Sequence, residues 1–181
     1  MGRMDSKYGR RGVTVIAYRY EMLACDSLWA SSHTIMTLQS KIVRLPSGAL
    51  YGASGDIDDR ALVPLLGHIK TSAGIPSPEA LGEIKQAIEA LLVLPNGEVW
   101  IINTPDDDDS AGAYQVKHPY TAIGCGKPVA LGAMAQGANA AQAVAAACEH
   151  NVHCRGPVHV MPLRQPAENV MALCQPAEKM K

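Results

Sequence analysis

The chain has 181 residues, of which 48% are hydrophobic and 18% are charged, a composition that excludes a disordered chain and favours one globular domain. Its formal net charge of −1 argues against nucleic acid as the main partner, because proteins that bind duplexes usually carry a basic excess. No apolar run approaches the ~20 residues that span a bilayer, so we expect no membrane segment.

The N-terminal half alternates short apolar runs with turns. Residues 1–13 lack apolar periodicity and are rich in Lys and Arg, which predicts a basic, flexible tail or pro-segment. Strands are expected at 13–19 and 22–25, and one or two more within 34–44. Residues 45–48 form a turn signal that leads into 49–52, so this segment predicts a hairpin.

Helical spacing then appears over residues 56–70. Three carboxylates suit the first turn of such a helix, and four apolar residues share one face: Asp56, Asp58 and Asp59, then Leu62, Leu65, Leu66 and Ile69. A shorter helix is predicted at 78–85. Residues 87–94 and 98–102 predict a second hairpin, because the Asn96-Gly97 pair between them is a strong turn signal.

The C-terminal third predicts a strand at 121–126, two Ala-rich helices at 128–136 and 138–150, and a last strand at 157–163. Gly137 separates the two helices, and the residues from 165 onward predict a loose tail. The chain contains no Phe, so the core must be filled by smaller residues and Met. Runs of strands and runs of helices, rather than strict alternation, favour an α+β layered sandwich.

Four residues stand where these strands begin or end. Thr14 opens the first strand, Asp26 ends the second, Lys41 follows a third segment, and Gly52 leads the turn at 52–56. Taken alone, each has an ordinary structural interpretation, because strand threonines, turn carboxylates and exposed lysines are common.

Taken together, these residues resemble the proteasome β-subunit and HslV type of N-terminal nucleophile hydrolase, especially the small versions found in phages and prophages. The similarity spans residues 14–163, and its blocks stand in the family's order: Thr14–Arg19, Leu23–Asp26, Lys41–Gly48, Gly52–Asp56, Ala122–Gly126, Ala130–Ala138 and Cys154–Val158. The resemblance implies a four-layer α-β-β-α sandwich over 14–164, without a cofactor or a metal.

The resemblance also implies amide-bond hydrolysis of a peptide or protein substrate by an N-terminal threonine. Thr14 matches the nucleophile, Lys41 the lysine that lowers its proton affinity, and Asp26 the carboxylate that pairs with this lysine. The Gly52 N–H matches an oxyanion-hole donor. The base would be the α-amine of Thr14, which exists only after cleavage before Thr14. A homo-oligomer is expected from the family, whereas an ATPase partner cannot be assigned.

The sequence departs from the family pattern at three places. Thirteen residues precede Thr14, and Val13 stands where self-processing relatives prefer Gly. Cys125 replaces a serine that packs beside the nucleophile. Asn151 replaces an aspartate that orients it, and an amide cannot hold negative charge. These departures motivate the alternative, a catalytically silent scaffold or structural component, for example of a phage particle, whereas the intact set of Thr14, Asp26 and Lys41 favours the peptidase.

The five cysteines set the expected compartment and suggest further chemistry. Their odd number, with no secretory segment upstream, argues against a disulfide framework and for a reducing compartment. We therefore expect the cytoplasm of a bacterial host, or a virion if the protein is structural. A Cys125 nucleophile paired with His118 or His153 is a further possibility that no spacing selects.

Two clusters of potential ligands compete with this interpretation. One contains Cys148, His150, His153, Cys154 and His159, whose spacing matches no standard zinc pattern. The other is the carboxylate run 106–109, which lacks the spacing and the glycine of an EF-hand loop. We expect a helix end followed by a strand in the first case and a solvated loop in the second.

Overall fold

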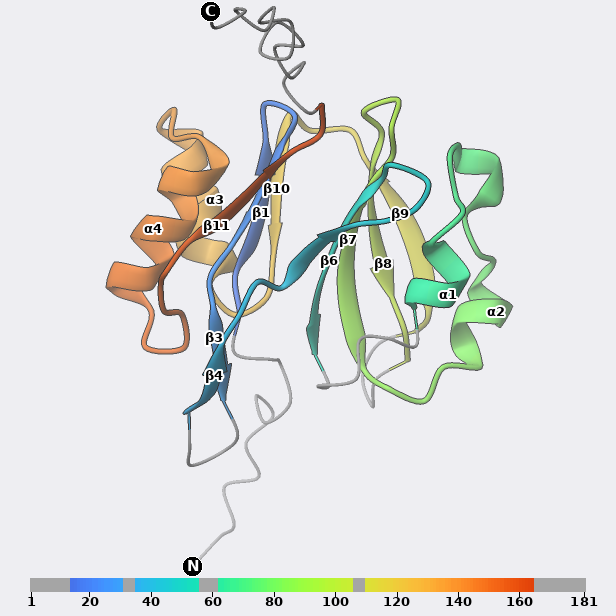
Figure 1. The fold of residues 1–181 in the computed structure, drawn as a ribbon, viewed down its shortest axis with the longest axis horizontal. Coiled ribbons are helices and arrows are strands. Elements are labelled where there is room, and N and C mark those ends of the chain that lie inside the picture. The colour runs from blue at the N-terminus through green and yellow to red at the C-terminus, as the bar shows by residue number, and fades with distance from the viewer. Residues whose placement is uncertain (1–13, 31–34, 56–61, 106–109, 165–181) are drawn as a thin grey trace, which may run out of the picture.

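Two antiparallel sheets lie face to face and carry helices on their outer sides (Figure 1). The computed structural model describes residues 14–30, 35–55, 62–105 and 110–164. Across these residues the order of layers is helices, sheet, sheet, helices (Figure 1). The prediction of an α+β sandwich is therefore confirmed at the level of layers. The predicted terminal segments, 1–13 and 165–181, lie outside the described residues.

The first sheet has four strands in the order β10-β1-β2-β11. Their bounds are Ile16–Arg19 for β1, Met22–Cys25 for β2, Tyr120–Ile123 for β10 and His159–Pro162 for β11. The hairpin register pairs Ile16 with Cys25, so the start of β1 lies beside the end of β2. The residues just before β1 and the residues just after β2 therefore lie close together at one end of these two strands.

The second sheet has five strands in sequence order, β5 to β9. These are Ile42–Arg44, Leu50–Gly55, Ile88–Val93, Val99–Asn103 and Gly112–Val116. A separate two-stranded ribbon joins β3, Leu28–Ala30, to β4, Ile35–Leu38. Both predicted hairpins are present, as β5–β6 and β7–β8.

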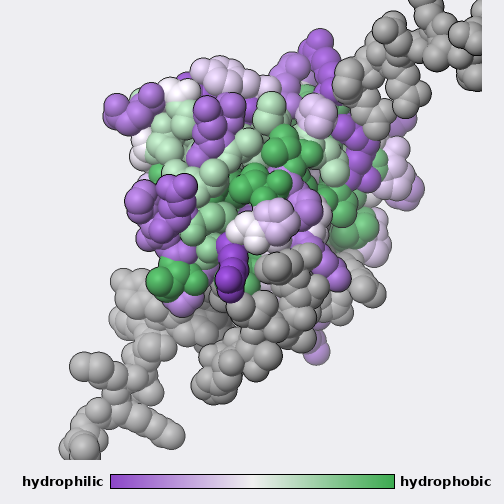
Figure 2. All heavy atoms as spheres, turned by 60° about the vertical axis from the view of Figure 1, so that its left-hand side comes forward, coloured by the Kyte–Doolittle hydropathy of each residue, from purple (hydrophilic) through white to green (hydrophobic). Residues whose placement is uncertain are grey.

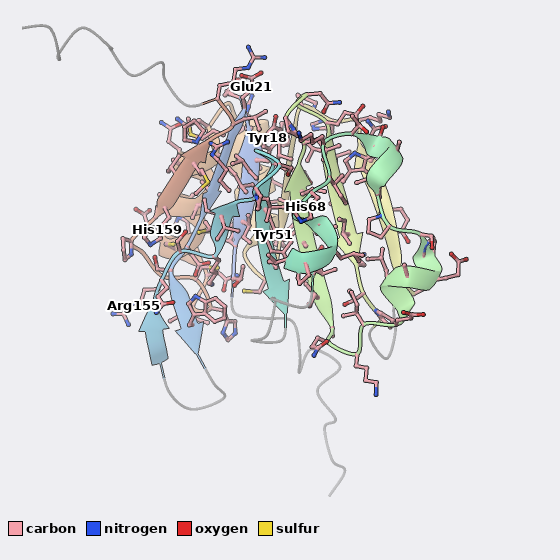
Figure 3. The ribbon with its side chains drawn as sticks, turned by 45° about the vertical axis from the view of Figure 1, so that its right-hand side comes forward. Tyr18, Glu21, Tyr51, His68, Arg155 and His159 are labelled. Atoms are coloured by element: carbon pink, nitrogen blue, oxygen red, sulfur yellow. The ribbon has the colours of Figure 1, made fainter. Side chains whose placement is uncertain are left out.

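Helices cover the outer face of each sheet. The helices α3, Lys127–Ala135, and α4, Ala140–His150, pack on β1, β2 and β10. On the other side lie α1, Val63–Leu66, a 3-10 turn at Ser72–Gly74, and α2, Pro78–Gly82. In Figure 3, Tyr51 of β6 lies in the layer beneath α1, where it belongs to the same buried cluster as Leu66.

Three apolar clusters hold the layers together. One joins α1 and α2 to the five-stranded sheet, and another joins the two sheets. The third joins α3 and α4 to the four-stranded sheet and consists mostly of small residues, among them Ala17, Ala24, Ala130, Ala143 and Ala147. Figure 2 brings the side with α3 and α4 forward and shows apolar residues gathered in its middle, with hydrophilic ones around them. This layer has the small-residue core that the missing Phe predicts.

The predicted helix over 56–70 is wrong in its extent. Within the described residues it covers only Val63–Leu66, with Gly67 as its C-cap. Pro64 lies in the first turn of this helix, the only part of a helix that a proline fits, because it lacks the N–H that a helix interior needs. Leu62, Leu66 and Ile69 are buried as predicted, whereas Leu65 is exposed. Asp56, Asp58 and Asp59 lie outside the described residues. Strands β3 and β9 were not predicted.

Two glycines of the helical layer allow a test of backbone strain. Gly132→Ala, at an open and exposed position of α3, should raise the free energy of unfolding by about 0.5–1 kcal/mol, because alanine favours a helix over glycine. Gly137→Ala should lower it by roughly 1–2 kcal/mol, because its φ of +101° strains an L-residue although no atom obstructs the new Cβ. Urea unfolding measures both, and equal effects of the two substitutions would contradict the role assigned to the positive φ of Gly137.

Candidate active site

The candidate site lies at the end of the four-stranded sheet where β1 begins and β2 ends, and it contains Thr14, Asp26 and Lys41. Thr14 lies two residues before β1, and Asp26 directly follows β2. The chain ties the two segments together, because the Asp26 N–H donates to the Val15 carbonyl oxygen at 3.1 Å. Lys41 directly precedes β5 of the facing sheet. The site is therefore formed across the interface of the two sheets.

The Lys41 ammonium group bridges the other two side chains. Its Nζ donates to Thr14 Oγ1 at 2.5 Å and to Asp26 Oδ1 at 2.8 Å. The side chains of Lys41 and Asp26 are 3% and 0% exposed, so water screens their charges little. A cation held at this distance stabilises negative charge that develops on the threonine oxygen, and this is what an attacking hydroxyl requires.

The carboxylate of Asp26 is fixed by three backbone donors as well as by Lys41. Oδ1 accepts from the Val15 N–H at 2.9 Å, and Oδ2 accepts from the N–H groups of Leu28 and Arg155 at 3.1 and 3.2 Å. These donors come from the residue before β1, from β3 and from the segment after α4, where Figure 3 labels Arg155. Three distant parts of the chain thus converge on one buried carboxylate.

Cys125 contacts the backbone of Thr14. Its Sγ accepts from the Thr14 N–H at 3.3 Å and lies 3.2 Å from the Thr14 carbonyl oxygen. The same carbonyl accepts from the Gly126 N–H at 3.1 Å. The loop after β10 therefore contacts both polar backbone groups of Thr14, its N–H and its carbonyl oxygen.

Asn151, the C-cap of α4, holds the Cys125 loop. Its Nδ2 donates to the Cys125 carbonyl oxygen at 2.9 Å, and its Oδ1 accepts from the His153 N–H at 2.9 Å. In these contacts Asn151 acts on Thr14 through Cys125. The structure thus brings five of the six predicted site residues into one connected network.

Gly52, the sixth, lies within β6 and pairs with Ile42 on one side and Leu91 on the other. A Cβ at this position would lie 2.8 Å from an Ile42 methyl and 3.1 Å from an Ile16 methyl. The glycine therefore lets the two sheets approach closely. Its role as an oxyanion-hole donor stays a prediction.

The structure places Gly124 against Thr14 and brings two further residues, Ser54 and Glu89, next to Gly124. Gly124 has a φ of +82°, and a Cβ on it would lie 2.4 Å from the Thr14 carbonyl oxygen and 3.2 Å from Ser54 Oγ. The Gly124 N–H donates to Glu89 Oε2 at 3.0 Å. Ser54 and Glu89 pair across β6 and β7. Ser54 belongs to the block 52–56 that resembles the family, whereas Glu89 stands in no recognisable motif, and only the pairing of β6 with β7 shows that Glu89 reaches the site.

A second thiol lies next to Cys125. The Sγ atoms of Cys125 and Cys154 are 4.0 Å apart. The pKa of Cys125 is lowered to about 6, mainly by the hydrogen bond with the Cys154 thiol. Burial raises this pKa, whereas the Thr14 N–H and the charge of His153 lower it further. The same hydrogen bond, followed by burial, raises the pKa of Cys154. At neutral pH the pair therefore consists of one thiolate and one thiol.

The competing clusters do not assemble in the described residues. Among them no group of three or more His, Cys, Asp or Glu side chains is placed to hold a metal ion. The carboxylate run 106–109 lies outside them. The two histidines suggested as partners of Cys125 have the following contacts. His118 contacts Tyr120 through its ring and its Nδ1. His153 lies near Cys125 through its backbone carbonyl oxygen, which is 3.7 Å from the Cys125 Sγ. No helix in the described part of the chain is long and apolar enough to cross a membrane.

Comparison with known proteins gives a likeness of fold. No family model matches the chain, and no curated protein matches it. Among solved structures it is similar to Thiobacillus denitrificans BPH, with a TM-score of 0.60 and 17% identity over 84% of this chain and 99% of that one. The same protein in complex with epoxomicin gives a TM-score of 0.52 and 18% identity over the same shares. At these identities the likeness shows the fold alone.

Removal of one partner of the buried pair should destabilise the protein. Lys41→Met leaves the Asp26 charge buried without its cation, so we expect a loss of about 3–5 kcal/mol in the free energy of unfolding. Lys127→Met is the matched control, because Lys127 lies 3.8 Å from Glu89 and is 41% exposed, and it should cost less than about 1 kcal/mol. Urea denaturation of both variants measures the difference, and equal losses would contradict the importance of the buried pair.

The two half-buried cysteines should differ in reactivity. Burial raises the pKa of Cys148 to about 11, whereas that of Cys125 is about 6. The thiolate is the reactive form, so alkylation of Cys125 by iodoacetamide should increase with pH and reach half of its maximal rate near pH 6. Cys148 should stay largely unmodified at pH 7. Peptide mapping after timed alkylation measures both rates, and a Cys125 rate that still increases steeply above pH 8 would contradict the assignment.

Proposed function

We propose that this protein is a proteasome-like threonine peptidase that hydrolyses amide bonds with Thr14 as an N-terminal nucleophile. The observation that carries the proposal is the buried contact of Thr14 Oγ1 with Lys41 Nζ, which in turn pairs with Asp26. Thr14 is only 4% exposed, so its hydroxyl needs a hydrogen-bond partner in any case. An ammonium group as that partner also stabilises the negative charge that develops on Oγ1 when the hydroxyl attacks a carbonyl carbon.

The chemistry requires cleavage of the bond between Val13 and Thr14. The freed α-amine accepts the proton of the Thr14 hydroxyl while Oγ1 attacks the carbonyl carbon of the substrate. The tetrahedral intermediate then collapses, the amine product leaves with that proton, and an ester on Thr14 remains. Water hydrolyses the ester and restores the hydroxyl. Lys41 stabilises the negative charge of Oγ1 in each half of the reaction.

Cys125 and Asn151 position the nucleophile in this proposal. The Cys125 Sγ lies against the Thr14 nitrogen at 3.3 Å, the atom that becomes the base. Asn151 fixes the carbonyl of Cys125 and so the loop that carries the thiol. Both contacts restrict the orientation of the amine relative to the hydroxyl, and such restriction contributes to rate.

Two further observations support the proposal. The sequence blocks that resemble the family's motifs include the three residues that meet in the site. In addition, a protein with a similar fold has been obtained in complex with epoxomicin, a proteasome inhibitor. A peptide-like inhibitor on a related fold supports a peptide or protein as the substrate class. Assembly into a homo-oligomer and a phage or prophage origin belong to the same proposal.

A silent scaffold is the second candidate, and the contacts of Asn151 favour it. This side chain uses its amide on Cys125 and on the His153 backbone, and it brings no negative charge to the site. The α-amine of Thr14 would then lack a carboxylate from this position. A silent protein would keep residues 1–13 and react with no substrate.

Processing and turnover should both depend on Thr14. The purified protein should show an intact mass that lacks residues 1–13, cleave fluorogenic peptides, and gain the mass of epoxomicin when treated with it. Thr14→Ala should keep the full-length mass, and both it and Lys41→Ala should lose at least about 10³-fold in kcat/KM. Thr71→Ala and Lys70→Ala, at exposed positions between α1 and the 3-10 turn at Ser72–Gly74, serve as matched controls.

The outcomes separate the two candidates. Control variants with unchanged turnover, together with inactive Thr14→Ala, support the peptidase. A full-length wild-type protein with neither turnover nor an epoxomicin adduct would instead leave the scaffold as the function.

A further inference from the structure

Two thiols that come from distant parts of the sequence lie side by side at the candidate site. Cys125 follows β10, and Cys154 follows α4, 29 residues later. We propose that Cys125 and Cys154 form an oxidation site that a peroxide-class oxidant converts to a disulfide next to Thr14. The formation of this disulfide does not depend on the proposed peptidase activity, whereas its effect on turnover does.

The geometry suits a disulfide after a small side-chain movement. The Sγ atoms are 4.0 Å apart and must approach to about 2.0 Å. Gly126 leaves room for this approach, because a Cβ on it would lie 2.7 Å from Cys154 Sγ. Cys125 is partly exposed, so an oxidant reaches it first, whereas Cys154 is only 4% exposed. Cys125 is therefore placed to react with the oxidant, and Cys154 is placed to react with the oxidised Cys125 and form the disulfide.

The protonation states of the pair match these two roles. A pKa of about 6 makes Cys125 a thiolate at neutral pH, and thiolates are the form that peroxide oxidises. The hydrogen bond with Cys125 and burial raise the pKa of Cys154, so it keeps its proton at neutral pH. Its proton is thus available when the second step begins.

The chemistry balances with hydrogen peroxide as the oxidant. The Cys125 sulfur attacks one peroxide oxygen, the O–O bond breaks, and the departing hydroxide takes a proton from water or buffer, which leaves a sulfenic acid. The Cys154 sulfur then attacks the Cys125 sulfur, the S–O bond breaks, and the departing hydroxide takes the Cys154 proton to form a second water. Two electrons pass from the thiols to the peroxide.

Oxidation should change the surroundings of Thr14. The Cys125 sulfur lies within 3.3 Å of the Thr14 nitrogen and 3.2 Å of its carbonyl oxygen. A disulfide pulls this sulfur toward Cys154 and removes its negative charge. The amine that serves as base would lose an acceptor, so turnover should decrease reversibly.

The other cysteines differ in their surroundings. Cys25 is buried, and its Sγ accepts from the Lys41 N–H at 3.4 Å; burial raises its pKa. The pKa of Cys148 is about 11, so little thiolate is present at neutral pH. Cys174 lies outside the described residues and must be followed in the experiment. We therefore expect oxidation at Cys125 first.

Disulfide mapping of the full chain tests the proposal directly. The protein is treated with a small excess of hydrogen peroxide, its free thiols are alkylated, and it is digested with trypsin and Glu-C. Cleavage after Glu149 separates Cys154 from Cys125, which a tryptic digest alone leaves in one peptide. Because Cys148 stays on the Cys125 peptide, the mapping is repeated in Cys148→Ala, which should keep the cross-link.

We expect a cross-linked peptide, a mass loss of ~2 Da that dithiothreitol reverses, and a parallel, reversible loss of turnover. Cys154→Ala should form no cross-link, and its Cys125 should proceed to sulfinic acid, which dithiothreitol does not reduce. Cys125 linked to Cys174 instead, or oxidised in the wild type without a cross-link, would overturn the proposal. A cross-link in a protein without peptidase activity would leave the oxidation site standing and refute only the proposed function.

Discussion

The buried ion pair of Lys41 and Asp26 is the constraint on which the rest of the site depends. Two charges that are 3% and 0% exposed lose their hydration at a cost of several kcal/mol each, and their attraction offsets this only if their remaining polar atoms are satisfied. The fold meets this requirement for Asp26 with backbone N–H groups from Val15, Leu28 and Arg155. The carboxylate of Asp26 is therefore the point at which the residue just before β1, the β3 ribbon and the segment after α4 must meet. This meeting also fixes the position of Thr14, which directly precedes Val15.

The facing arrangement of the sheets explains how Lys41 arrives there. The β1–β2 register brings Thr14 and Asp26 to the same end of the four-stranded sheet, but Lys41 belongs to the other sheet. The distance between the sheets at this end is short because Gly52 presents no side chain to Ile16 and Ile42. A larger residue would separate the sheets and lengthen the 2.5 Å contact of Lys41 with Thr14. Gly52 thus serves the site through packing, whatever its N–H contributes to the reaction.

Sequence patterns predicted the elements whose signals are local. The hairpin at Asn96-Gly97 and the break at Gly137 depend on residues that need a left-handed backbone, and both glycines have it, with φ of +89° and +101°. The helix over 56–70 was overextended because apolar spacing outweighed Pro64. The short strands β3 and β9 gave no clear alternation. Glu89 could not be found in advance, because only the pairing of β6 with β7 and the approach of Gly124 bring it to the site.

The small residues of the outer helical layer also affect the chemistry. Because α4 presents Ala143 and Ala147 to the sheet, its axis can lie close to β1 and β2, and its C-cap, Asn151, reaches the loop that contacts Thr14. Asn151 directly follows α4, Cys154 comes three residues later, and both contact the Cys125 loop. A helix packed through large side chains would lie farther from the sheet and carry both residues away. Of the thiols, Cys125 thus adjoins Thr14, the residue on which the proposed activity depends, and Cys154 adjoins Cys125.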